Sequence, residues 1–165
     1  TTSSDPSVNL ARGIQAYYSG DYRNAFAILH PLAEKDQPRA QFRIGMMYYQ
    51  GRAAVQNQDL ARQWFARALP DILRLAQNNE AWAQADLGTA YELGVGVVRD
   101  PERAAKWYQK SARQNYPGAQ ANLGVLYAKG EGVKYDRQAA IYWLKRAAAQ
   151  GDLAAKANLK ALNAR

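Results

Sequence analysis

The sequence predicts an all-α protein, an α/α superhelix (solenoid) of about four helix-turn-helix repeats followed by a C-terminal capping helix. The first reason is a motif at a fixed interval: LGTAYELGVGV at residues 87–97 returns 36 positions later as LGVLYAKGEGV at 123–133. The second is the four-residue spacing of apolar side chains within each copy, which places them on one face of a helix. Repeats of this length are typical of stacked helical hairpins, which bury their apolar faces only against their neighbours.

An earlier and longer copy of the motif begins at Ile44 and Gly45. Its tryptophan, Trp64, lies 43 residues before Trp107, whereas Trp107 and Trp143 are 36 residues apart, so this copy holds seven extra residues. We therefore expect a polar N-terminal tail at 1–6 and a single repeat domain at 7–165. The domain divides into repeats at about 7–37, 38–79, 80–116 and 117–151, and a capping helix at 152–163.

The first repeat is the shortest of the four. Gly13 and Ala16 fit a first helix, and Gly20 and Tyr22 fit a tight turn before a second helix that contains Ala25. Proline lacks the amide proton that an interior helical position donates. We therefore expect Pro31 to distort this second helix.

The second repeat departs from the motif in its loop and in its second helix. Ala53 replaces the second loop glycine, and Asn57 replaces the aspartate that caps the second helix in the later repeats. The extra residues prolong that helix through Leu75. Because Pro70 lies within the extension, the sequence predicts a kink or a break there.

The third and fourth repeats share one pattern. Gly94 ends the first helix, because glycine enters the left-handed conformation at low cost, and Asp100 caps the second helix with Pro101 at its first position. Glycines inside the first helices allow close packing, and tryptophans on the second helices are expected to fill the core beside them. The glycines are Gly45, Gly88 and Gly124, and the tryptophans are Trp64, Trp107 and Trp143.

The motif A-x-x-x-L-G-x-x-Y-x-x-G-x-G-V-x-x-D-x-x-x-A-x-x-W resembles the Sel-one-like repeat (SLR), a relative of the tetratricopeptide repeat. The third and fourth repeats match it nearly throughout, over 83–112 and 119–148, and the second matches less well. The first is more similar to a plain tetratricopeptide unit. The resemblance implies a non-catalytic scaffold for protein–protein interaction, often bacterial and often in the cell envelope, regulation or secretion.

The composition narrows the chemistry that this chain can perform. It has no cysteine and one histidine, His30, so thiolate metal sites and cysteine nucleophiles are excluded and a histidine cluster cannot form. We expect no catalytic residue, no cofactor and no metal site. No long uncharged apolar run predicts a transmembrane segment. The polar start is typical of a processed chain, which favours a periplasmic or cell-envelope location, with the cytoplasm as the alternative.

Positive charge is concentrated in the last two repeats and the capping helix. Residues 101–165 carry 12 Lys or Arg and 4 Asp or Glu, whereas residues 1–100 carry ten of each kind. A basic stripe at helical spacing contains Arg103, Lys106, Lys110 and Arg113. The stripe is either an ordinary solvated face, with Glu102 able to pair with Lys106, or a patch for an acidic partner.

The partner that the sequence favours is another protein or peptide segment. In a tetratricopeptide-like stack, residues beside the Leu-Gly pair of each first helix point into a concave surface. Trp82 joins them because the other repeats have Arg39 and Gly118 at its position; the alternative is that it covers the inserted segment near Ile72 and Leu75. The expected surface comprises Tyr18, Phe42, Met46, Tyr49, Trp82, Thr89, Glu92 and Val125. The alternative is an anion-binding module for RNA, an acidic polysaccharide or an anionic membrane surface, although a nucleic acid is the less favoured partner.

Overall fold

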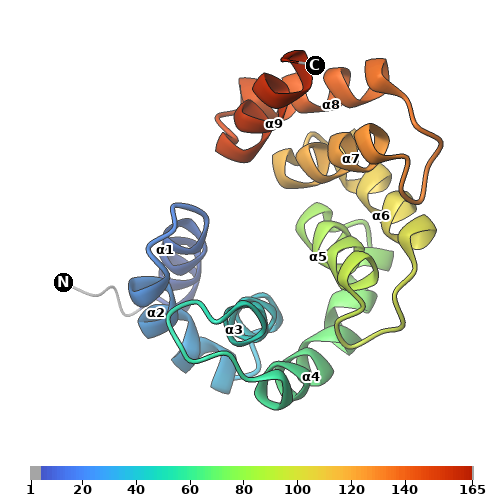
Figure 1. The fold of residues 1–165 in the computed structure, drawn as a ribbon. Coiled ribbons are helices and arrows are strands. Elements are labelled where there is room, and N and C mark those ends of the chain that lie inside the picture. The colour runs from blue at the N-terminus through green and yellow to red at the C-terminus, as the bar shows by residue number, and fades with distance from the viewer. Residues whose placement is uncertain (1–4, 165) are drawn as a thin grey trace. The chain divides into compact units, whose positions relative to one another are not determined.

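The computed structural model describes residues 5–164, and within this range all regular structure is helical (Figure 1). The described residues form nine helices: α1 (Pro6–Tyr18), α2 (Tyr22–Glu34), α3 (Pro38–Gln50), α4 (Gln58–Gln77), α5 (Ala81–Leu93), α6 (Pro101–Arg113), α7 (Pro117–Lys129), α8 (Arg137–Ala149) and α9 (Leu153–Asn163). Of the expected polar tail, residues 1–6, the first four lie outside the described part of the chain. Asp5 caps α1, which begins at Pro6.

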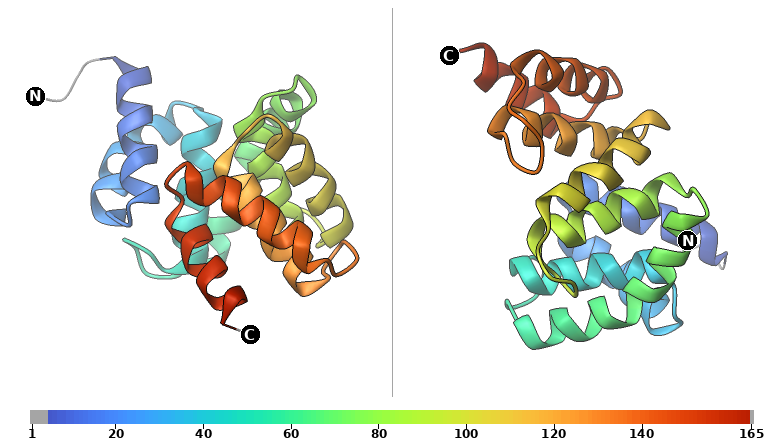
Figure 2. Two further views of the ribbon diagram at one scale, coloured as in Figure 1. Left: turned by 90° about the horizontal axis from the view of Figure 1, so that it is seen from above. Right: turned by 90° about the vertical axis from the view of Figure 1, so that its right-hand side faces the viewer.

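The chain forms two compact units, one ending at Ile72 and one beginning at Leu73. In the first unit α2 packs against both α1 and α3. In the second unit α5 pairs with α6 and α7 with α8, while α6 also contacts α7 and α8 also contacts α9 (Figures 1 and 2). Each hairpin of the second unit therefore packs against the next one, as the repeat pattern predicts.

Helix lengths reproduce the repeat spacing. Seven of the helices have 13 residues each, whereas α4 has 20, so the seven extra residues of the second repeat all extend one helix. The predicted break at Pro70 is wrong, because α4 continues through it to Gln77. Pro31 likewise lies inside the continuous helix α2.

The predicted helix ends are confirmed. The side chains of Asp100 and Asp136 accept hydrogen bonds from the amides of Arg103 and Ala139, which have no partner within their helices. Asn57 performs the same role by accepting from the Leu60 amide. Left-handed glycines end three of the first helices: Gly51, Gly94 and Gly130.

The glycines inside the first helices are contact points with the second helices. A methyl group added at Gly88 would lie 2.6 Å from the Tyr108 ring, and one at Gly124 would lie 2.7 Å from Cγ of Leu144. A methyl group added at Gly45 would likewise lie 2.8 Å from Cε1 of Phe65. In each pair the large side chain follows the tryptophan of the motif by one residue.

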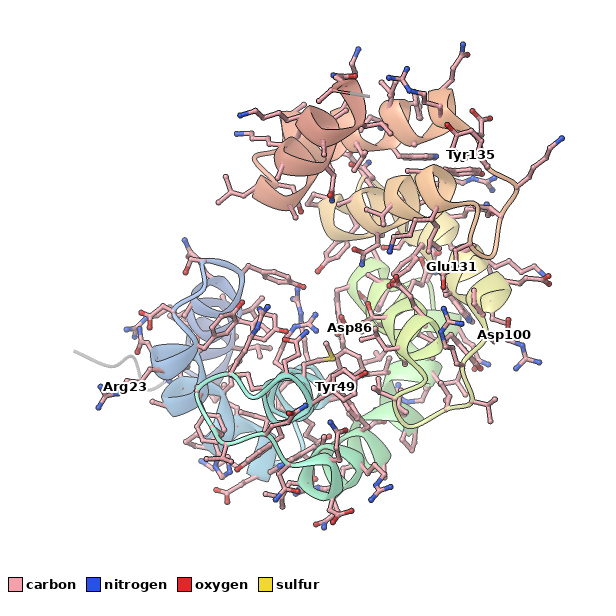
Figure 3. The ribbon with its side chains drawn as sticks, in the orientation of Figure 1. Arg23, Tyr49, Asp86, Asp100, Glu131 and Tyr135 are labelled. Atoms are coloured by element: carbon pink, nitrogen blue, oxygen red, sulfur yellow. The ribbon has the colours of Figure 1, made fainter. Side chains whose placement is uncertain are left out.

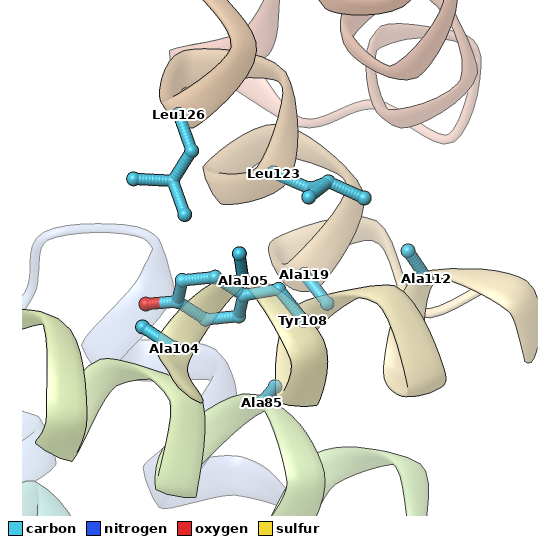
Figure 4. Packing of buried hydrophobic residues seen from close by; sticks show 8 residues of the cluster. All are labelled: Ala85, Ala104, Ala105, Tyr108, Ala112, Ala119, Leu123 and Leu126. Atoms are coloured by element: carbon cyan, nitrogen blue, oxygen red, sulfur yellow. The ribbon is translucent and has the colours of Figure 1, made fainter. Parts of the chain in front are cut away.

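The predicted core role of the tryptophans is therefore wrong for Trp107, which is half-buried, whereas Trp143, also half-buried, packs against the buried cluster of α5, α6 and α7. Adjacent residues point about 100° apart around a helix, so burial of one turns the other to the rim. In α6 the buried residue is Tyr108, which packs among alanines and leucines of α5, α6 and α7 (Figure 4). Trp64 is more enclosed, with 9% of its surface exposed.

Three buried glutamines join each hairpin to the next. The side-chain amides of Gln41, Gln84 and Gln120 donate to the last-turn carbonyls of Ala33, Ala76 and Ala112, at 3.1–3.2 Å. Each amide also donates to the side chain of a left-handed turn residue: Asp36, Asn79 and Asn115. The glutamines recur at offsets of 43 and 36, so these hydrogen bonds belong to the repeat.

Successive loops of the second unit also contact each other. Arg99, before α6, forms an ion pair with Glu131, before α8. Figure 3 labels Glu131 and the neighbouring cap residue Asp100 on these two loops. The backbone at Gly132 lies so close to the Pro101 carbonyl that an added methyl group would be 2.1 Å from its oxygen. Only glycine fits this loop position.

The last helix matches the first helices in part. At the 36-residue offset, Ala155 of α9 corresponds to Ala119, and both are buried. Lys156 and Lys160 stand where α7 has Gln120 and Gly124. A lysine at position 160 does not allow the close helix contact that Gly124 makes with Leu144.

We predict that Gly88→Ala destabilises the protein by up to about 2 kcal/mol. The added methyl group crowds the buried Tyr108 ring, and overpacking of about 1–3 kcal/mol exceeds the roughly 1 kcal/mol that alanine contributes to helix propensity. Thermal and urea unfolding measure the difference from the parent.

The matched control is Gly118→Ala in α7. Its methyl group would lie 3.4 Å from the nearest atom, Cε1 of Tyr116, which is ordinary contact. This variant should therefore be as stable as the parent or up to about 1 kcal/mol more stable. A Gly88→Ala protein as stable as the Gly118→Ala protein would contradict the close contact with Tyr108.

Candidate functional site

Two residues of the expected partner surface are not accessible. Phe42 and Met46 have exposed fractions of 0% and 4%. The Phe42 ring packs 5.3 Å from that of Phe65, centroid to centroid. The prediction that these two side chains contact a partner is therefore wrong, because both already lie within the protein.

Thr89 and Glu92 surround the hydroxyl group of Tyr108. The Tyr108 hydroxyl donates to Oε2 of Glu92 at 2.6 Å and lies 3.0 Å from Oγ1 of Thr89. Burial, followed by the negative charge of Glu92, raises the pKa of Tyr108 well above its ordinary value. Thr89 and Glu92 remain half-buried, so they join α5 to α6 while leaving part of their surface outside.

Val125 lines a mainly apolar hollow in the second unit. Its walls come from the C-terminal half of α7, from Leu144 of α8 and from the last turns of α9. The lining residues are Val125, Ala128, Lys129, Leu144, Asn158, Ala161 and Leu162. The hollow contains Val125, one of the expected partner-surface residues, and is completed by Leu144 of α8 and by the expected capping helix α9.

The three remaining aromatic candidates differ in their exposure. Tyr18 is 55% exposed, whereas Tyr49 of the first unit, labelled in Figure 3, and Trp82 of the second unit are half-buried. The Tyr49 carbonyl accepts a hydrogen bond from the Gln56 side chain at 2.9 Å, which ties the following loop to α3.

Tyr18 belongs to a cluster of tyrosine and arginine side chains in the first unit. The Tyr17 ring makes edge contacts with Tyr18 and Tyr22, each at 5.5 Å between centroids. Nη2 of Arg43 donates to the Tyr18 hydroxyl at 2.9 Å, and its guanidinium carbon lies 5.3 Å from the Tyr17 ring centroid. Burial raises the pKa of Tyr17 to about 12.

The basic stripe is exposed and borders a groove, which we call the α6 groove. All four cations of the stripe line it together with two aromatic rings and one amide. The lining residues are Tyr91, Arg103, Lys106, Trp107, Gln109, Lys110 and Arg113. The Nζ atom of Lys110 lies 4.5 Å from the Trp107 ring centroid, and the Arg103 guanidinium carbon lies 5.6 Å from that of Tyr91.

The sequence predicts Trp107 in the core, whereas the structure places it in the wall of the α6 groove. A pattern that indicates the arrangement was present: each second-helix tryptophan is followed three residues later by Arg67, Lys110 or Arg146. Each of these cations lies over the tryptophan ring, at 4.7 Å for Arg67 and 5.9 Å for Arg146.

His30 lies in an aromatic environment. Its ring stacks on Phe26 at 5.1 Å and meets the edge of Trp64 at 5.7 Å, centroid to centroid. Across residues 5–164 the structure has no group of three or more His, Cys, Asp or Glu side chains placed to hold a metal ion. In the same range no helix has the length and apolar character to cross a membrane.

Comparison with known proteins identifies the repeats. A family model described as the Sel1 repeat matches residues 38–69, 83–116 and 117–152. The structure is similar to a Sel1 repeat protein from Oxalobacter formigenes with 37% sequence identity, over 80% of this chain and 94% of that one, at a TM-score of 0.51. The predicted all-α repeat fold is confirmed.

A second similar structure is a protective antigen present in uropathogenic Escherichia coli strains, displaying an SLR fold. It is 28% identical, and the similarity covers 92% of this chain and 32% of that chain, with a TM-score of 0.54. The chain thus spans about a third of the length of this longer protein.

We predict that the protein loses stability as the pH rises above 10, in part because of Tyr17. An unfolded tyrosine titrates near pH 10, whereas Tyr17 in the folded protein titrates at about 12. Between these values the unfolded chain has already released a proton that the folded chain retains. Rising pH therefore favours unfolding, by about 1.4 kcal/mol for each pH unit of the interval.

Urea unfolding from below pH 8 up to pH 12 measures this loss. Tyr17→Phe should reduce the slope of stability against pH above 10 and leave the slope below pH 8 unchanged, where neither state of the tyrosine releases its proton. Tyr142→Phe is the control, because Tyr142 is 51% exposed. An equal slope for the parent and Tyr17→Phe above pH 10 would mean that the Tyr17 proton is not linked to folding.

Proposed function

Because the chain belongs to the Sel1 repeat family, we propose that it is a non-catalytic adaptor that binds a segment of another protein. The binding surface consists of residues on the first helices of the hairpins. Helical-repeat proteins bind through such extended surfaces, which can hold a peptide or a helix.

The observation that carries this proposal is the hollow at Val125. Its lining is mainly aliphatic, with the Lys129 and Asn158 side chains as its polar members. An apolar pocket with a few polar groups suits an apolar anchor side chain of a peptide or of an amphipathic helix. The hollow also contains Val125, which the repeat spacing predicts as a partner-surface residue.

Other first-helix residues extend the proposed surface within each compact unit. In the second unit these are Trp82, Thr89 and Glu92, all half-buried, and in the first unit they are Tyr18 and Tyr49. Partly exposed aromatic side chains favour partner binding, because they bury a large area at a small cost in conformational entropy.

We predict that Ala161→Arg abolishes or weakens partner binding at least tenfold, equivalent to about 1.4 kcal/mol. Ala161 lines the hollow and is exposed on α9, so the new side chain fills the hollow without entering the core. Affinity capture from cells of the source organism identifies the partner by mass spectrometry, and calorimetric titration with the purified partner measures the affinity.

The matched control is Ala154→Arg, the same change on the same helix. Ala154 is exposed and lies outside the hollow, so this variant should bind the partner as the parent does. Circular dichroism must show both variants folded. A partner bound equally by the parent and by Ala161→Arg would exclude the hollow as its binding site.

We also propose a bacterial setting in the periplasm or cell envelope. The support comes from the two similar structures, both of bacterial proteins. Fractionation of the source cells, followed by immunodetection, should recover the chain outside the cytosol. Recovery mainly with a cytosolic marker enzyme would contradict this location and leave the adaptor proposal intact.

A further inference from the structure

The α6 groove combines positive charge with a defined shape. Helix α6 has four cationic side chains and a single acidic residue, Glu102. Arg103 is partly neutralised by Asp100, whose Oδ2 lies 3.3 Å from its Nε. Within residues 5–164 no carboxylate forms an ion pair with Lys106, Lys110 or Arg113, so the expected pairing of Glu102 with Lys106 does not occur. The groove thus carries positive charge that the protein itself leaves uncompensated.

The spacing of the cations sets the length of a ligand. Arg103 and Arg113 are ten residues apart in one helix, which corresponds to about 15 Å along its axis at 1.5 Å per residue. In an extended peptide, side chains on one face recur about every 6.6 Å. Three acidic side chains at alternate positions therefore span about 13 Å and match the row of cations.

The two aromatic rings of the groove already have partners. Lys110 lies over the Trp107 ring and Arg103 over the Tyr91 ring. These contacts restrain the two cations and occupy one face of each ring, which reduces the ring surface open to a stacking nucleic-acid base. The groove consequently favours point contacts between cations and carboxylates over stacking of bases.

We propose that the α6 groove binds a short acidic segment of a partner protein, extended along α6, with Asp or Glu at three or more alternate positions. The argument rests on the charges and rings of the α6 groove. It does not depend on the hollow at Val125, so either site can fail its test while the other stands.

Fluorescence anisotropy with a labelled peptide of alternating Glu and Ser tests the proposal at about 50 mM salt. The expected result is saturable binding that weakens when the salt is raised to 0.5 M, because the contacts are exposed charges. The same peptide with Gln in place of Glu should not bind. Absence of saturable binding by the Glu peptide to the folded parent overturns the proposal.

Charge reversal locates the site. Lys106→Glu combined with Lys110→Glu should weaken binding of the Glu peptide at least ~10-fold, because two attractive contacts become repulsive. The control is Lys156→Glu combined with Lys160→Glu, which changes the net charge equally at exposed positions of α9. The control should change the affinity by less than about threefold. An equal loss in both double variants would mean that only the net charge matters, and the groove would be excluded.

Competing ligands decide the class of partner. An oligothymidylate and a heparin fragment, each matched in charge to the Glu peptide, are titrated under the same conditions. Tighter binding of the Glu peptide than of either polyanion supports the proposal. Tighter binding of the oligothymidylate or of the heparin fragment, abolished by the α6 double variant, would assign the groove to that class and overturn the proposal.

Discussion

Each hairpin depends on one contact, in which a glycine of the first helix meets a large side chain of the second. The pairs are Gly13 with Leu29, Gly45 with Phe65, Gly88 with Tyr108 and Gly124 with Leu144. Glycine inside a helix costs about 1 kcal/mol relative to alanine, and the close packing that it permits offsets this cost. The contact also fixes the rotation of the second helix. It directs Tyr108 inward and leaves Trp107 at the rim, so the same constraint that stabilises the core creates the α6 groove.

The glutamine contacts extend this local order along the chain. A buried side-chain amide without hydrogen-bond partners would lower the folding stability by about 1–3 kcal/mol. Gln84 and Gln120 avoid this loss because the end of the preceding helix and a left-handed Asn both supply acceptors. Gln114 and Gln150 continue the network by donating to Oε1 of Gln84 and Gln120, at 2.8 and 2.9 Å. Within the second unit, the end of α4 and the two hairpins that follow it are thereby held in one register through polar groups, in addition to their apolar contacts.

The two proposed binding surfaces differ because the two helices of a hairpin expose different kinds of side chain. The small residues of α7 and α9, with Leu144 of α8, leave an apolar hollow. Second helices carry the charges, since their outer faces pack against no later repeat, and α6 has four cations on such a face. An adaptor with an apolar site and a basic site can contact a partner by two different kinds of force, one sensitive to salt and one insensitive.

The sequence by itself determined the repeats, the helix limits and the caps, because these depend on neighbouring residues and on periodic spacing. It also selected the basic stripe and Val125. Only the tertiary structure decided which of Trp107 and Tyr108 is buried, since both are large aromatic residues and one position in a helix separates them. The same holds for Phe42 and Met46, whose apolar character suited a core as well as a binding surface. The pairing of the Tyr91 ring with Arg103, and the hollow between α7 and α9, arise from segments that meet only when the hairpins pack.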